Sequence, residues 1–184
     1  MPTEPTLLRL WRPAFPAGTL RAIILHWTAG DYDTPYSAYH FCLSGENDAY
    51  VHATHALEAN MRELKTGDPV DYAAHTAGRN SFAAGIAVCA MRGAAPEDFG
   101  EFPVTVPQIE ALCALAAQLV RAYDIRLGRV RTHAEAALAD GYFGAGSADR
   151  RWDLARLEPA PHALRLEEAT ATGDRLRARI AELA

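Results

Sequence analysis

The sequence lacks a surplus of positive charge. Its 184 residues contain 18 lysines and arginines against 23 aspartates and glutamates, which gives a formal net charge of −5 at pH 7. A surface that follows the phosphates of a nucleic acid depends on clustered lysine and arginine. We therefore expect no nucleic-acid partner, and an anionic polymer would have to be bound locally.

The sequence also lacks long hydrophobic runs, a secretory signal and an even number of cysteines. No apolar stretch approaches the roughly 20 residues of a membrane-spanning helix, and residues 1–5 show no basic region leading into an apolar one. The three cysteines, Cys42, Cys89 and Cys113, lie in apolar segments, which argues against a disulfide framework. We expect cytoplasmic synthesis and no membrane span.

The pattern of apolar residues is that of a single α/β domain with a central mixed β-sheet flanked by helices. Residues 1–20 contain four prolines and are predicted to form an extended arm. The main domain is expected at 21–160, and 161–184 should be a C-terminal helix packed on it or extending from it. Strands are predicted at 21–27, 38–43, 49–53, 85–91 and 129–132, and helices at 107–123, 150–157 and 163–184.

The first predicted strand ends on a histidine. Residues 21–30 are apolar up to His26 and break at Gly30. A strand end is where a fold can present a metal ligand or a catalytic base, although a lone histidine is more often a packed core residue. His133 and Asp153 could join His26. Two imidazoles and a carboxylate make a catalytic zinc set with one position left for water, but spacing alone does not establish it.

Five sequence blocks together carry a resemblance that no one of them carries alone. They resemble, in order and over residues 20–157, the zinc-dependent N-acetylmuramoyl-L-alanine amidase family, which includes amidase-type phage endolysins and peptidoglycan recognition proteins. The blocks are IILHWTAG at 23–30, AYHF at 38–41, AHTAGRNS at 74–81 followed by GIAV at 85–88, THAE at 132–135 and RWDL at 151–154.

The resemblance implies that residues 21–160 are an amidase catalytic domain with one zinc in a surface groove. The expected reaction is hydrolysis of the peptidoglycan amide that joins N-acetylmuramic acid to L-alanine. His26, His133 and Asp153 map onto the zinc ligands, and Tyr39 onto a tyrosine that positions or activates the attacking water. The residues expected to bind substrate are His75, Asn80 and Trp27, with support of a ligand as the alternative for the first two.

The chain departs from the family pattern at the catalytic base. Many bacterial members carry a glutamate where this chain has Ala87, and phage-type members use a lysine where it has Arg151. Arginine does not readily release a proton, so Arg151 could stabilise an oxyanion but not act as a general acid. The proton for the leaving amine would then come from water on the zinc, from Tyr39 or from Glu135.

Blander explanations stay open for several of these residues. Asp153 could pair with Arg150 or Arg156, Tyr39 could be a core tyrosine, and Arg151 could belong to a solvated run of charges. Glu135 could only cap or orient His133, and His40, on the opposite strand face from Tyr39, is expected to be structural.

Other functions stay open as well. The runner-up is a non-catalytic module that binds peptidoglycan or muropeptides, and the presence of Asp153 favours the enzyme. A cysteine nucleophile fits poorly because burial raises a thiol pKa. With no signal peptide, an endolysin that reaches the cell wall after release, a recycling amidase and an injected effector are all compatible. We expect a monomer.

Overall fold

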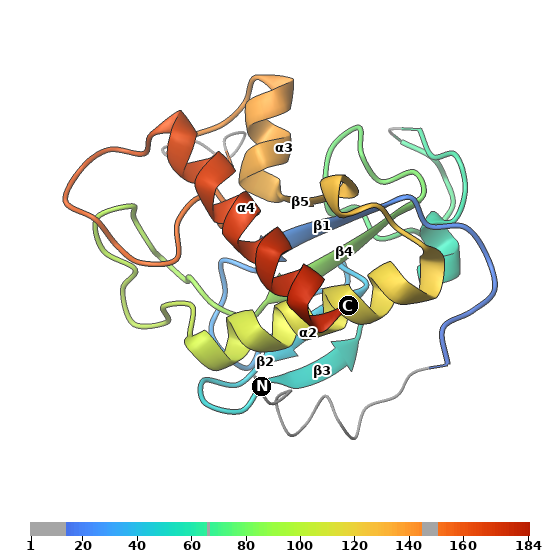
Figure 1. Cartoon of the computed structure of the whole chain (residues 1–184), viewed down its shortest axis with the longest axis horizontal. Helices are drawn as coiled ribbons and strands as arrows, with labels where there is room; N and C mark the ends of the chain where they lie inside the picture. Colours follow the sequence, from blue (N-terminus) through green and yellow to red (C-terminus); the bar gives the residue numbers. More distant parts are fainter. Residues whose placement is uncertain (1–13, 66, 145–150) are drawn as a thin grey trace.

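A mixed sheet forms the centre of the computed structural model, which describes residues 14–65, 67–144 and 151–184 (Figure 1). In this part of the chain the sheet has five strands in the order β3-β2-β4-β1-β5. β4 and β5 pair in parallel with β1, β2 pairs in parallel with β4, and β3 is antiparallel to β2 at the edge. The strands are β1 (Ala22–Trp27), β2 (Phe41–Ser44), β3 (Tyr50–Ala53), β4 (Ala83–Val88) and β5 (Val130–Thr132).

Helices α2 (Val106–Tyr123) and α4 (Leu166–Leu183) cross in front of the sheet in Figure 1. α2 begins at a reciprocal cap between Thr105 and Gln108 and ends at Asp124, which takes a left-handed φ of 51°. The third α-helix of the described residues, α3 (His133–Asp140), follows β5 directly, and short 3₁₀ turns are η1 (Leu57–Asn60) and η2 (Leu127–Arg129).

The main hydrophobic core lies between the sheet and α2. Side chains alternate across a strand, so Ile23, Leu25 and Trp27 of β1 enter this core together with Leu112 and Leu115 of α2. The intervening residues of β1 face the other side of the sheet. That alternation places His26 on the face away from α2.

The strands and the long helix confirm an α/β fold with a mixed sheet. One predicted helix is absent and one helix was missed. The structure contains α3, which was not predicted, and residues 151–157 form no helix, because Leu154 has a left-handed φ of 59°. β2 begins only at Phe41, since 37–40 form a turn. Of the predicted arm, residues 1–13 lie outside the described part, and 14–20 form neither helix nor strand.

α4 is shorter than predicted at its start, and it packs on the domain. Its buried side chains, including Leu176 and Ile180, join the main core. No helix among the described residues combines the length and apolarity needed to cross a membrane.

Candidate metal centre

His26 lies in β1, between β4 and β5, and is fully buried. Its neighbour Trp27 points the other way and is only 4% exposed. The indole packs in the core against Trp152, at a centroid distance of 4.6 Å, and against Phe99. The alternation of the strand thus places the Trp27 side chain, expected to bind substrate, in the core and away from the cluster.

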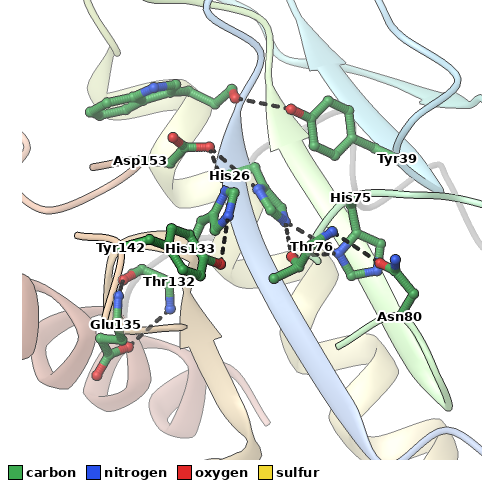
Figure 2. A network of polar contacts seen from close by, with 11 residues as sticks. His26, Tyr39, His75, Thr76, Asn80, Thr132, His133, Glu135, Tyr142 and Asp153 are labelled. Carbon is green, nitrogen blue, oxygen red and sulfur yellow. Dashed lines mark hydrogen bonds and ion pairs between the residues drawn. The ribbon is translucent and has the colours of Figure 1, made fainter. Parts of the chain in front are cut away.

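His26, His133 and Asp153 meet at one point, although they come from three separate segments (Figure 2). The Nδ1 atom of His26 lies 3.4 Å from Oδ2 of Asp153, and Nδ1 of His133 lies 3.1 Å from the same oxygen. One ligand atom from each residue lies within 4.8 Å of the others. All three side chains are buried, so the cluster is held by the fold.

The donor set fits zinc. Ligand atoms at about 2.0–2.2 Å from a tetrahedral zinc are about 3.3 Å apart, and the two distances to Asp153 match this spacing. Burial lowers the pKa of His26 to about 4, against the opposing hydrogen bond from Asp153, so its imidazole is neutral at pH 7. Burial opposes ionisation of Asp153, but hydrogen bonds to His133 and His26 outweigh it and hold its pKa below the usual value.

Both histidine rings have partners on the side away from Asp153. Nε2 of His26 lies 3.3 Å from Oγ1 of Thr76 and 3.4 Å from Nδ1 of His75, and Nε2 of His133 lies 3.3 Å from the hydroxyl of Tyr142. Such partners fix the tautomer and orientation of a metal-binding histidine. Sequence reasoning missed Thr76 and Tyr142; Thr76 follows His75 in a block already noted, but no local pattern indicates Tyr142.

His75 supports His26 and also lines the groove described below. It is 6% exposed, and burial followed by the charges of His26 and His40 lowers its pKa well below the ordinary value. Its ring lies against Gly85 of β4, where an added Cβ would approach the ring Cγ to 2.5 Å. Asn80 uses its Oδ1 to accept from the backbone N–H of Thr76, at 2.9 Å, and so holds the turn that carries His75.

A groove of about 620 Å³ opens beside the cluster. His133 and His75 lie in its wall, and the exposed Arg151 is at its edge, so a positive charge stands beside the candidate metal centre. The pairing of Asp153 with Arg156 is excluded, because Arg156 bonds Glu168 at 2.6 Å instead; Arg150 lies outside the described residues. Other lining residues are Lys65, Tyr72, Ala77, Asn80 and Tyr142.

Tyr39 lies beside His26 on the sheet face that carries the cluster. The two ring centroids are 5.0 Å apart, and the Tyr39 hydroxyl donates to the carbonyl oxygen of Trp27 at 3.3 Å. Burial, with a smaller contribution from the charge of Asp153, raises its pKa well above the usual value. The hydroxyl therefore keeps its proton at neutral pH.

Glu135 does not point into the cluster (Figure 2). Its carboxylate accepts from the backbone N–H of Thr132 at 2.9 Å and forms two 2.8 Å bonds with Arg177. The structure thus places the carboxylate of Glu135, a candidate proton donor, in the cap of α3 and in an ion pair with Arg177.

The position of the missing glutamate lies beside His26. Ala87 pairs with His26 in the register of β1 and β4, so a carboxylate there would face the site, but this chain has a methyl group. Cys42 and Cys89 pack around Ala87 and are fully buried. His40 is structural, as expected, because its Nδ1 accepts from the N–H of Gly85 at 3.0 Å.

Comparisons with known proteins identify the family but not a near relative. AmpDH3 from Pseudomonas aeruginosa is 21% identical, with a TM-score of 0.41, and the match covers 67% of this chain and 54% of that one. AmiD from E. coli, solved in complex with anhydro-N-acetylmuramic acid-L-Ala-D-gamma-Glu-L-Lys, is 25% identical, with a TM-score of 0.41 and coverage of 67% of this chain and 52% of that one. The endolysin of Thermus scotoductus bacteriophage Ph2119 is 18% identical, with a TM-score of 0.43 and coverage of 70% of this chain and 83% of that one.

The chain spans about half the length of the first two of these proteins. No curated protein matches the sequence. The family model described as N-acetylmuramoyl-L-alanine amidase matches residues 16–153, which include His26, His133 and Asp153. The chain therefore belongs to the N-acetylmuramoyl-L-alanine amidase family.

Proposed function

We propose that this protein is a zinc-dependent N-acetylmuramoyl-L-alanine amidase that cleaves peptidoglycan between N-acetylmuramic acid and L-alanine. The observation that carries the proposal is the meeting of two histidines on one carboxylate oxygen of Asp153, beside an open groove. Zinc, when bound, would polarise the amide carbonyl and make water nucleophilic at neutral pH. The family match supports the choice of substrate.

The residues around the cluster divide the remaining work. Arg151 carries a permanent charge at the groove and could stabilise the oxyanion that develops when water attacks the amide. Tyr39, whose raised pKa keeps its proton in place, would orient that water by hydrogen bonding. With Glu135 occupied by Arg177 and Tyr39 keeping its proton, the proton for the leaving amine would come from the attacking water.

His75 and Asn80 would serve both substrate and metal centre. Both line the groove, and both also hold the turn whose Thr76 hydroxyl meets His26. The nearby Lys65 and Arg151 make the groove suitable for the carboxylates of a stem peptide.

The test is digestion of purified peptidoglycan with and without a chelator. We expect new L-alanine amino termini to be released, the rate to fall to background with 1,10-phenanthroline, and zinc but not magnesium to restore it. His133→Ala should release none. A chelator-insensitive rate, or activity retained by His133→Ala, would contradict the metal mechanism.

The same experiment distinguishes the runner-up function. A non-catalytic binding module would sediment with the cell wall and release no amino termini at any zinc concentration. Action on the cell wall after cytoplasmic synthesis, as in an endolysin, is part of this proposal and is compatible with the same site.

A further inference from the structure

Helix α4 lies outside the family match at 16–153, yet it contacts both segments that bring late ligands to the candidate metal centre. One segment is the start of α3, where His133 is the first helical residue. The other is the irregular stretch that follows Asp153. Each contact is polar and specific, as the distances show.

The first contact joins α4 to the cap of α3. The Arg177 guanidinium donates two hydrogen bonds of 2.8 Å to the Glu135 carboxylate, and the side chains of Arg177 and Glu135 are only 18% and 12% exposed. Glu135 in turn accepts from the N–H of Thr132, while the Thr132 hydroxyl accepts from the N–H of Glu135. This reciprocal cap fixes the first turn of α3, and His133 stands in that turn.

Gly173 makes this contact possible. An added Cβ there would come within 2.2 Å of the carboxylate carbon of Glu135. Gly173, a weak helix former, is thus the point where α4 comes close enough for Arg177 to reach Glu135. Its φ is not in the left-handed region, so the requirement is for space.

The second contact holds the chain just after Asp153. The hydroxyl of Thr172 donates to the carbonyl oxygen of Ala155 at 2.8 Å, and the buried Arg156 pairs with Glu168 at 2.6 Å. Between them and Asp153, Leu154 takes the left-handed φ of 59°, a conformation that costs free energy for leucine and persists where its surroundings impose it.

We infer that α4 positions the ligands of the candidate zinc site, with Arg177 and Gly173 setting His133 through Glu135. Neither residue touches the metal position, so both are positioning residues. The inference rests on the proposed function in that zinc is the metal. It adds that a helix beyond the family match sets the affinity of the site.

The experiment measures zinc affinity of the metal-free protein by competition with a chromophoric chelator. Gly173→Ala should favour the helix by propensity but push the Glu135 carboxylate aside, and Arg177→Ala removes its partner. We expect zinc binding weaker by about fivefold in both, less than the 10-fold or more that follows the loss of a group bonded directly to a ligand. Arg177→Lys, which keeps one charged contact, should recover part of the affinity.

Arg179→Ala is the matched control. Arg179 sits on the same helix and pairs with Glu110 and Glu182, away from α3. It should bind zinc within about twofold of the wild type. The visible absorption spectrum of the cobalt-substituted protein should change in Gly173→Ala and not in the control.

Wild-type affinity in Gly173→Ala and Arg177→Ala, or equal weakening in Arg179→Ala, would overturn the positioning role alone. If the wild type itself binds no zinc, the metal mechanism of the proposed function fails, and this inference fails with it.

Discussion

One oxygen atom, Oδ2 of Asp153, brings the two candidate histidine ligands together. Without metal it accepts from both imidazoles, at 3.4 and 3.1 Å, and so keeps their Nδ1 atoms aimed at one point. A buried ionised carboxylate needs such partners. The same contacts therefore stabilise the ionised Asp153 in the interior and preorganise the candidate metal site.

A second buried histidine, His40, should make the protein acid-labile. Burial and then the charge of His55 lower its pKa from 6.5 to about 4. The unfolded chain therefore binds this proton from about pH 6.5 downward, while the folded chain binds it only near pH 4. Stability is complete above pH 6.5 and is lost as the pH falls toward 4, by on the order of 3 kcal/mol for this group.

Urea unfolding of the metal-free protein at several pH values between 4.5 and 7.5 measures this loss, and NMR titration of the histidine rings assigns it. His26, whose pKa is also lowered to about 4, adds to the fall in the same direction. A free energy of unfolding that stays level from pH 7.5 to 4.5 would contradict the prediction.

Among the elements, β4 supports the site through a glycine, Gly85, whose lack of a side chain leaves space for a neighbouring ring. Gly85 leaves room for the ring of His75, and its N–H is satisfied by His40. The strand was recognised in the sequence by its apolar run, but the reason for glycine at this position lies in a contact with a loop.

Gly85→Ala should displace His75, because the new Cβ would lie 2.5 Å from its Cγ. His26 would lose a partner at Nε2, and we expect zinc affinity to fall about 10-fold together with a stability loss of about 1–3 kcal/mol. Chelator competition and urea unfolding measure the two effects.

Gly128→Ala is the control, because a Cβ there meets nothing within 4 Å. If Gly85→Ala binds zinc as tightly as Gly128→Ala does, the support of His26 by His75 is not needed for the metal.

Strands and the long helix were predictable because their apolar periodicity is local. α3 was missed although it has a local signal, the capping box from Thr132 to Glu135. The prediction of a helix at 150–157 was wrong for the described residues 151–157. The left-handed backbone of Leu154 interrupts this stretch, and its charged and apolar residues give no sign of that conformation. Tyr142 and Arg177 could not be found from the sequence, because their roles depend on contacts made only in the folded chain.

At the scale of the molecule, the sheet separates two environments. One face is covered by α2 and α4 and holds the apolar core; the other carries His26, His75 and the groove. The layered arrangement lets a single strand, β1, serve both, with Trp27 in the core and His26 at the site.

Zinc should stabilise the whole domain. A ligand that binds only the folded state at about 100 times its Kd adds about 2.7 kcal/mol, which for a domain of this size raises Tm by roughly 5–10 °C. Differential scanning calorimetry with and without zinc measures the shift. His133→Ala should show no shift of Tm with zinc. A wild-type Tm that does not change on addition of zinc would contradict a metal site in the folded state.

The candidate ligands are far apart along the chain, since His26 and Asp153 are separated by 127 positions. Within the described residues, the strand that carries His26 pairs only with strands that come much later. An unfolded chain offers no pair of neighbouring ligands that zinc could bridge early. We therefore expect zinc to bind after folding and to stabilise the protein mainly by slowing its unfolding. Loading and removal of zinc then become events of an already folded protein, open to control by the metal supply around it.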